Sequence, residues 1–546
     1  MPQEDSVQII IDNVYSLLNC DYNYDHILTS VRNAFKEEND IYLWKVSKKP
    51  HLRYRYNITK KGQFYTGLVS AVYNFIKKKH GITPAIIDLR TKEGIDDSKE
   101  LVDYRLENME IKFRKYQENA IQKGLNNPRG VFVYPTGSGK TIIMSGLVAA
   151  LNTKTLVVCS KVDLARQLQR EISSYTGLTV GIIAGGKFEV GDITVAVVQS
   201  LTNKKTGARK KSIIEDFLLS IRYLVFDECH HNQAATWQKV SMLCKNAYYR
   251  HGFTATFMTS KIQKSTGKEQ KDTNNLILHT GKVISKISIG DVVDAGYLAR
   301  PEIKYIKYPH HIKRSDVRGL DYAKVYERDI AGNYDRNFLV ASIASNKYKL
   351  DKQVIIFVNR ISQGKMLREM LVELFGIGEN EVMFISGSHS EQQKKINLAM
   401  FAAGKFPILI GTSIIGEGLN FFCDCGINAS AGDSDITAVQ RLGRILRKKK
   451  PGLNEDVNIS EDRFVEYWEV FDTKHIWFGG HSKSRYKIYA EQGFIPREVE
   501  ESDVIDNELL AEAMASLENF DPSDEEIEAE EFIPGKVKLT SKGKLE

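Results

Sequence analysis

The sequence predicts an α/β protein with two tandem parallel-sheet lobes, a small α+β domain in front of them and an acidic tail behind. Three observations support this prediction. Apolar runs of strand length alternate with helical patterns twice along the chain, as they do in parallel sheets. A glycine-bearing turn and a helix start follow the first strand of the first block. Near the carboxyl end, acidic residues replace the mixed charges of the rest of the chain.

The predicted N-terminal domain covers residues 1–105. Residues 42–45 and 52–56 alternate like strands, and residues 67–79 have the apolar period of a helix. Its candidate nucleic-acid contacts are Lys45, Arg53 and Arg55. Basic residues interleaved with aromatic ones suit contact with a phosphate backbone and stacking on bases. A solvated strand face explains the same charges, so both interpretations stay open.

The two predicted lobes cover residues 106–300 and 301–495. The strands predicted in the first lobe are residues 130–134, 155–159, 193–198, 223–226 and 250–253. Those predicted in the second lobe are residues 353–358, 382–386, 407–411 and 425–429. Most of these runs are apolar throughout, as expected of strands covered by helices on both faces. Residues 261–272, between the two blocks, are polar and lysine-rich, which indicates a loop.

A predicted phosphate loop follows the first strand of the first lobe. Its residues are Pro135, Thr136, Gly137, Ser138, Gly139, Lys140 and Thr141. A strand, a glycine turn and a helix start direct consecutive backbone N–H groups at one point, where they bind phosphate oxygens. Lys140 would neutralise the β and γ phosphates, and Thr141 would hold Mg²⁺. Tyr134 stands where this pattern usually has glycine or alanine, so the sequence does not determine the exact shape of the loop.

Two adjacent acids, Asp227 and Glu228, end another apolar strand, and Asp227 lies 87 residues after Lys140. Asp227 would orient the metal, and Glu228 would orient the attacking water. Phosphate loops and acid pairs at strand ends, in this order, are typical of proteins that hydrolyse a nucleoside triphosphate with Mg²⁺.

The composition limits the class of protein. The chain has 546 residues and is 42% hydrophobic, enough for several buried cores. Because no apolar run approaches the ~20 residues that span a bilayer and the start lacks secretory features, we expect no membrane contact and a location in the cytoplasm of a bacterium or an infected host. The six cysteines form no Cys-x-x-Cys pair, so we expect reduced core residues and no zinc.

Charge is unevenly distributed along the chain. The whole chain carries +7, but residues 498–531 contain 15 acidic and no basic residues. The body that precedes them is therefore strongly basic, which suits a polyanion partner. The predicted tail, residues 496–546, includes a helical apolar period over 503–520. It could dock on the basic body, recruit a protein partner, or remain a disordered solubilising segment.

Further motifs resemble those of superfamily 2 helicases and translocases. Residues 113–117 resemble the Q motif, residues 252–256 motif III, residues 410–420 motif V and residues 440–447 motif VI. Within that superfamily, residues 64–69, 448–450 and 481–489 are similar to phage UvsW-like branch-migration helicases, with XPB-like and type III restriction translocases further away. The resemblance implies two RecA-like lobes, ATP and Mg²⁺ as cofactors, and DNA, both double-stranded and branched, as the partner of a monomer.

The resemblance also assigns roles around the nucleotide. Gln117 would read the adenine edge, and Arg114 would contact the nucleotide or the phosphate loop. Arg444 and Arg447, three apart on one helix face, would reach the γ phosphate from the second lobe. Motif V would add Gly416 and Glu417 to the nucleotide site. Thr254 and Thr256 of motif III would link this site to the nucleic-acid track, and His230 would couple it to motif VI. Gln440 of motif VI is a further coupling residue.

Nucleic-acid contacts are implied for short polar residues that follow predicted strands. These residues are Ser160, Lys161, Gln199, Ser200, Asn359, Arg360, Thr412 and Ser413. Hydroxyl and amide groups suit phosphate contacts. Strand-end hydroxyls are also ordinary helix caps, which is the competing interpretation.

Taken together, the motifs predict an ATP-driven DNA helicase or translocase that remodels forks, Holliday junctions or displacement loops in replication, recombination or repair. Three alternatives stay open. The chain could be the motor of a restriction or defence complex, although residues 88–92 lack the carboxylate that a nuclease motif needs two residues before its lysine. It could act on RNA, because backbone contacts do not reveal whether a 2′-hydroxyl is tolerated. A non-enzymatic ATP-binding scaffold is the fourth possibility.

Overall fold

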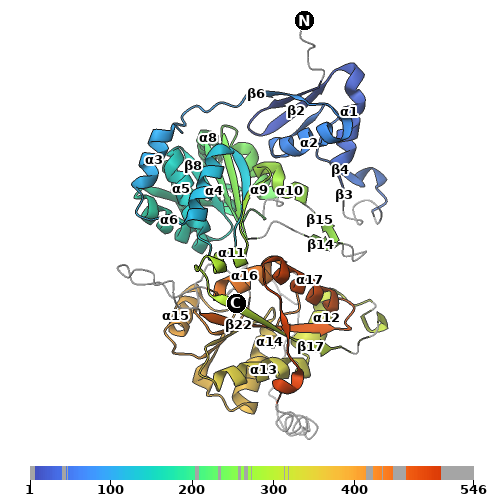
Figure 1. Cartoon of the computed structure of the whole chain (residues 1–546), viewed down its shortest axis with the longest axis vertical. Helices are drawn as coiled ribbons and strands as arrows, with labels where there is room; N and C mark the ends of the chain where they lie inside the picture. The colour runs from blue at the N-terminus through green and yellow to red at the C-terminus, as the bar shows by residue number, and fades with distance from the viewer. Residues whose placement is uncertain are drawn as a thin grey trace, which may run out of the picture.

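The computed structural model describes residues 7–39, 45, 47–202, 208–230, 235–255, 260–262, 269–271, 273–310, 312, 314–317, 319–412, 422–432, 435–446 and 463–505. They form a small N-terminal domain and two larger α/β lobes (Figure 1). The predicted α/β class and the two tandem parallel-sheet lobes are confirmed. Residues 506–546, which hold most of the predicted acidic tail, lie outside the described residues. No helix in the described part of the chain has the length and apolar content to cross a bilayer.

The N-terminal domain is a four-stranded sheet with the order β5-β2-β1-β6, packed against two helices. Its elements are β1 (Val7–Ile11), β2 (Tyr15–Cys20), α1 (Asp25–Ala34), β5 (Gln63–Tyr65), α2 (Val69–His80) and β6 (Ala85–Asp88), with a separate hairpin of β3 (Lys36–Glu38) and β4 (Tyr54–Tyr56). The predicted helix is confirmed as α2, which buries Val72 and Ile76. The strand predicted over 52–56 is only Tyr54–Tyr56. Residues 42–44 lie outside the described residues.

The N-terminal domain packs on the first lobe through α10 (Thr273–Thr280). Leu278 of this helix belongs to the buried apolar cluster of the N-terminal domain. The backbone of Gly67 lies so close to α10 that an added Cβ would overlap the Ile277 carbonyl oxygen. Arg129 of the first lobe donates a hydrogen bond to the Asn13 carbonyl oxygen. The small domain is therefore joined to the first lobe by packed surfaces as well as by the chain.

The first lobe is an eight-stranded sheet with the order β10-β9-β11-β8-β12-β13-β7-β16, parallel except for β10. Its strands are β7 (Arg129–Val133), β8 (Thr155–Cys159), β9 (Val180–Ala184), β10 (Lys187–Glu189), β11 (Ile193–Val197), β12 (Tyr223–Asp227), β13 (Tyr249–Thr254) and β16 (Val283–Lys286). One face carries α3 (Lys99–Glu107), α4 (Lys115–Asn126), α5 (Lys140–Leu151) and α6 (Val162–Thr176); the other carries α7 (Val198–Thr202), α8 (Ala208–Ser220) and α9 (Ala235–Leu243). All five predicted strands are confirmed, within one or two residues at each end.

The second lobe is a seven-stranded parallel sheet with the order β19-β20-β18-β21-β22-β17-β23. Its strands are β17 (Arg300–Pro309), β18 (Val354–Phe357), β19 (Val382–Ile385), β20 (Ile408–Gly411), β21 (Cys425–Asn428), β22 (Phe464–Thr473) and β23 (Arg497–Glu498). Its helices include α11 (Ile289–Asp294), α12 (Tyr322–Tyr326), α13 (Tyr334–Tyr348), α14 (Ile361–Glu369), α15 (Glu391–Ala402), α16 (Asp435–Ile445) and α17 (Phe478–Glu491). The four predicted strands are confirmed, and the long neighbours β17 and β22 were missed.

Two segments pack with the second lobe although the predicted boundaries at 300 and 495 leave them outside it. Helix α11 buries Ile289 and Val292 in the second lobe's core. After β23, Val504 and Ile505 enter that core from the other side. Between the lobes, β14 (Ser260–Ile262) and β15 (Glu269–Lys271) pair as antiparallel strands within the segment predicted to be a loop. Of the six cysteines, five are buried, in agreement with their prediction as core residues.

A buried ionic cluster joins α13 to the end of β22. Arg336 donates two hydrogen bonds to Asp472, at 2.7 and 3.1 Å, and His310 Nε2 lies 2.9 Å from the same carboxylate. All three side chains are buried. Burial alone would raise the pKa of Asp472, but Arg336 and His310 hold it well below the ordinary value. The carboxylate is therefore ionised, and both of its neighbours depend on its charge.

Replacing Asp472 with asparagine should destabilise the second lobe by about 3–5 kcal/mol, because Arg336 would be left buried without a counter-charge. The loss is measured by urea unfolding followed through tryptophan fluorescence. Since the folded-state pKa of Asp472 is depressed, its stabilising contribution is complete above the ordinary aspartate pKa of about 3.9 and disappears as the pH falls below it. Glu373→Gln, a change of the same kind at an exposed position, should shift stability by no more than about 0.5 kcal/mol. Equal effects of the two substitutions would contradict the ionic role.

Candidate active site

The predicted phosphate loop is a turn between β7 and α5. Gly137 and Gly139 adopt left-handed conformations, with φ of 87° and 82°, which side chains rarely tolerate. Ser138 is buried, and its hydroxyl closes the turn by donating to the Pro135 carbonyl oxygen at 2.7 Å. Helix α5 begins at Lys140, and no side chain caps its N-terminus. The first N–H groups of α5 are thus left for an anion, as in phosphate-binding loops.

Tyr134, the residue that differs from the usual loop pattern, is buried in the core of the first lobe. Its side chain is 2% exposed, and its hydroxyl lies 2.9 Å from the Ser285 hydroxyl of β16. Its backbone N–H donates to Thr254 in the neighbouring strand. Tyr134 therefore extends β7 by one pairing and leaves the turn that follows it unobstructed.

The acids predicted at the end of β12 face the phosphate loop. Lys140 Nζ lies 3.2 Å from Glu228 Oε1. His230 Nδ1 lies 3.3 Å from the other oxygen of Glu228 and 3.2 Å from the Thr254 hydroxyl. His230 therefore connects the acid pair to the end of β13, and its coupling role stays a prediction. Glu228 itself has φ of 49°, an uncommon value for a residue with a side chain.

The two acids have opposite electrostatic environments. Burial first, and then the charge of Glu228, raise the pKa of Asp227 above its ordinary value. Burial also acts on Glu228, but Lys140 and His230 outweigh it and hold the pKa of Glu228 well below its ordinary value. A hydroxyl and a carboxylate are oxygen ligands of the kind that Mg²⁺ prefers, so Thr141 and Asp227 fit the predicted metal. A cation there would favour the ionised form of Asp227.

Gln117 is completely buried in this structure, and its predicted role in reading the adenine edge stays a prediction. Its oxygen accepts the Arg114 backbone N–H at 2.9 Å, and its nitrogen donates to the Ser138 carbonyl oxygen at 3.2 Å. Gln117 also packs directly on Gly139, where an added Cβ would lie 2.4 Å from the amide nitrogen. It supports the phosphate loop from within the protein.

Helix α16 brings the second lobe to the phosphate loop. An added Cβ on Gly443 would lie 3.0 Å from the Thr136 carbonyl oxygen, so the two backbones are in close contact. The predicted arginine Arg444 is the next residue and is 7% exposed. Gln440 is half-buried on the same helix. Five predicted site residues lie outside the described residues: Thr256, Ser413, Gly416, Glu417 and Arg447.

Arg441, on the same helix, was not predicted. It is 2% exposed and donates to Asn428 Oδ1 at 2.7 Å and to Asn359 Oδ1 at 2.8 Å. It therefore ties α16 to the ends of β18 and β21. A signal for it does exist in the sequence, because Arg441 falls on the apolar face of the helical period between Ala438 and Ile445.

The residues predicted to contact nucleic acid lie at the carboxyl edges of the two sheets. Ser160 and Lys161 follow β8, Gln199 and Ser200 lie in α7 after β11, Asn359 and Arg360 follow β18, and Thr412 follows β20. Parallel pairing collects these strand ends at the same edges as the phosphate loop and α16. Their role in binding nucleic acid stays a prediction.

The basic residues of the N-terminal hairpin are partly paired. Arg53 lies 3.0 Å from Glu38, and Arg55 forms an ion pair with Glu37 across the same two strands. Lys45 is exposed. Two of the three candidate cations therefore have acidic partners, which lowers the positive charge of this surface relative to the predicted one.

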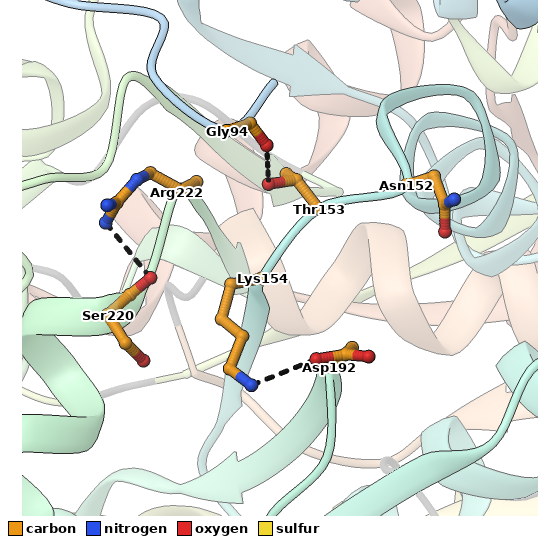
Figure 2. Close-up of a pocket in the computed structure, with 7 residues that line it drawn as sticks. All are labelled: Gly94, Asn152, Thr153, Lys154, Asp192, Ser220 and Arg222. Atoms are coloured by element: carbon orange, nitrogen blue, oxygen red, sulfur yellow. Dashed lines mark hydrogen bonds and ion pairs between the residues drawn. The ribbon is translucent and has the colours of Figure 1, made fainter. Parts of the chain in front are cut away.

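A polar pocket lies at the opposite, amino edge of the first sheet (Figure 2). Lys154 pairs with Asp192 at 2.9 Å, and Thr153 donates to the Gly94 carbonyl oxygen. Arg222 donates to the carbonyl oxygens of Glu93 and Ser220. These side chains hold the connection from the N-terminal domain against the lobe, and none of the predicted site residues lines the pocket.

The fold and the site define a two-lobed protein in which a phosphate loop on one lobe faces an arginine-bearing helix on the other. Comparison with known protein families supports this description of the two lobes. Residues 110–259 match the family of the type III restriction enzyme res subunit, and residues 336–449 match the helicase conserved C-terminal domain. The chain belongs to the superfamily 2 helicases.

Relatives of known name are distant. The chain is 25% identical to the DNA 3′-5′ translocase XPB2 of Sulfurisphaera tokodaii, over 66% of this chain and 84% of that protein. It is 26% identical to a protein named Rad25 from Haloarcula marismortui, over 66% of this chain but only 53% of the relative's length. The ATP-dependent DNA helicase uvsW of phage T4 is 20% identical, over 62% of this chain and 66% of that protein. This match supports the predicted UvsW-like relationship, although the XPB-like identities are higher.

Among solved structures, the type ISP restriction-modification enzyme LlaBIII bound to DNA is similar in fold. The TM-score is 0.52 at 17% identity, and the match covers 79% of this chain and 34% of that one. At this level of sequence identity, the comparison supports only the similarity in fold.

Glu228→Gln should lower the turnover number for ATP by about 10²–10⁴-fold, because the water would lose the group that orients it. Affinity for ATP should not fall, since Lys140 would lose an acidic partner that competes with phosphate. Steady-state hydrolysis and titration with a fluorescent ATP analogue measure the two quantities. Asp192→Asn, the same type of change at the amino edge of the same sheet, should leave both unchanged. Normal turnover by the Glu228 variant would remove the assignment.

Proposed function

We propose that this protein is an ATP-dependent DNA translocase or helicase that remodels branched DNA such as forks, Holliday junctions and displacement loops. Membership of the superfamily 2 helicases supports the ATP-driven part. The relatives named as DNA helicases or translocases support DNA as the partner. The activity on branched DNA rests on the UvsW-like resemblance.

The observation that carries the proposal is the contact between Gly443 and Thr136. It brings α16, the helix of the second lobe that carries Arg444, to the phosphate loop of the first. Arginines supplied in this way stabilise the charge that develops during phosphoryl transfer. ATP held by the first lobe would draw α16 inward, and loss of the γ phosphate would release it. Nucleotide state would thereby set the distance between the lobes and between the two polar carboxyl edges.

The test is ATP hydrolysis by the full chain with no nucleic acid, linear duplex DNA, a synthetic four-way junction, or an RNA duplex of the same sequence. We expect stimulation by DNA, largest with the junction, and ATP-dependent conversion of the junction into duplex products. Arg444→Ala should abolish both activities. A hydrolysis rate indifferent to DNA would refute the proposal, and stronger stimulation by RNA would redirect it to RNA.

A second function, the motor of a restriction complex, is favoured by the res-subunit match and by the fold of LlaBIII. The nearest nuclease-like segment does not favour cleavage. Asp88 pairs with Arg90 at 2.6 Å, and Lys92 pairs with Asp97 at 2.7 Å. Scission of supercoiled plasmid by the purified chain with ATP and Mg²⁺ would support this function over the first.

A further inference from the structure

A buried hydrogen bond joins the start of the phosphate loop to the strand that leads into the second lobe. Tyr134 is the residue directly before the loop, and Ser285 lies in β16. Their hydroxyl oxygens are 2.9 Å apart, and the two residues are 2% and 6% exposed. Burial raises the pKa of Tyr134, so its hydroxyl stays protonated. Because water is excluded from this bond, it restrains both partners more strongly than a bond at the surface would.

A β-bulge in β16 brings the serine hydroxyl to this position. The register shifts so that Ser285, rather than Ile284, is the partner of Phe132. Phe132 and Tyr134 belong to the core cluster on one face of the sheet, and Val133 belongs to the cluster on the other face. In an unbroken register, Ser285 would pair with Val133 and point away from Tyr134. The bulge therefore turns the hydroxyl toward Tyr134, which is one of the known uses of bulges near functional sites.

Ser285 lies directly before the connection between the two lobes. The Ile287 N–H still donates to the first-lobe sheet, at the Val133 carbonyl oxygen, over 3.1 Å. Ser288 then caps α11, which lies at the junction of the lobes and packs into the core of the second one (Figure 1). The Ile287 side chain packs on the cores of both lobes. Residues 286–288 therefore form the interlobe hinge, a short connection about which one lobe can move against the other.

The second lobe holds the other end of this hinge. The Ile289 N–H donates to Gln492 Oε1 at 3.1 Å, and the Gly290 N–H donates to the Gln492 carbonyl oxygen at 3.0 Å. On the first-lobe side, the bond between Tyr134 and Ser285 is a side-chain anchor of the strand that enters the hinge. The hinge is thus restrained at both ends, and one of the restraints is attached to the phosphate loop.

We propose that the bond between Tyr134 and Ser285 is a positioning link, which fixes the interlobe hinge to the start of the phosphate loop. A fixed pivot returns α16 to the same place on the loop each time the lobes close, so that Arg444 approaches the phosphates in one geometry. Tyr134 and Ser285 are buried and act through the hinge, so they are positioning residues. The link accounts for a tyrosine at the position where the loop pattern usually has a small residue. This inference rests on the proposed use of ATP at the same loop.

The competing explanation is that the bond only satisfies a buried tyrosine hydroxyl. Tyr223, at the amino edge of the same sheet, offers a matched case. Its side chain is also buried, and its hydroxyl lies 3.2 Å from His251 Nδ1. Removal of either hydroxyl leaves a buried partner unsatisfied and should lower stability by a similar amount. Only the bond beside the hinge should also affect turnover.

The experiment measures ATP hydrolysis by the full chain, without nucleic acid and with linear duplex DNA, and affinity for a non-hydrolysable ATP analogue. Tyr134→Phe and Ser285→Ala should each lower the turnover number about three- to tenfold, the effect expected from one hydrogen bond. The double variant should lose no more than either single variant, because both substitutions remove the same bond. The dissociation constant for the analogue should not change, since the first lobe holds the phosphates. Ser285→Thr, which keeps a hydroxyl, and Tyr223→Phe should both turn over ATP at the wild-type rate.

Wild-type turnover by Tyr134→Phe would overturn the proposal. Losses that multiply in the double variant would also overturn it, because the two side chains would then act independently. Weaker binding of the analogue would assign Tyr134 to the shape of the phosphate loop, and an equal loss of turnover in Tyr223→Phe would assign the effect to stability. If the melting curve of Tyr134→Phe shows a disturbed fold, the comparison of Ser285→Ala with Ser285→Thr decides. Each variant is compared with the wild type under the same conditions, so the outcome is independent of whether DNA stimulates hydrolysis, which is the test of the proposed function.

Discussion

The closeness of two backbones, at Gly443 in α16 and Thr136 in the phosphate loop, is the constraint on which the rest of the site depends. A Cβ at position 443 would lie 3.0 Å from the Thr136 carbonyl oxygen, a separation at which the neighbour has to give way. Glycine allows the arginine helix of one lobe to rest on the loop of the other. A side chain at this position would require the phosphate loop or the helix that carries Arg444 to shift.

The position of α16 is in turn held by polar groups buried in the second lobe. Arg441 binds the ends of β18 and β21, and Arg485 of α17 binds Glu469 of β22 at 2.9 Å. Asn428 connects the two sets through its bond to Glu469. Buried ionic groups of this kind add little net stability compared with apolar packing. Their hydrogen bonds are satisfied in only one arrangement of the helices and strands that carry them. A helix that has to meet another lobe at contact distance needs such a defined position.

Local sequence predicted the strands of the first lobe and the turn between β7 and α5, and it predicted the second lobe less completely. The loop from Pro135 to Thr141 and the acids Asp227 and Glu228 are contiguous patterns on either side of a turn, so their geometry follows from a few adjacent residues. The burial of Gln117 did not follow from the local pattern, because the same residue type can face a ligand or the core, and its packing on Gly139 is a tertiary contact. Strands β17 and β22 were missed because charged residues interrupt them, and these charges are satisfied by neighbouring strands, as Lys304 is by Glu466.

The sequence by itself determined the α/β class, the order of the two lobes and the phosphate-binding turn, because periodicity and glycine placement act over a few residues. Only the tertiary structure decided that Tyr297 meets Arg114, that Gly443 meets Thr136 and that Arg441 holds Asn359. These pairs are far apart in the chain. Their meeting depends on how two sheets and their helices pack, which the pattern around either residue does not encode.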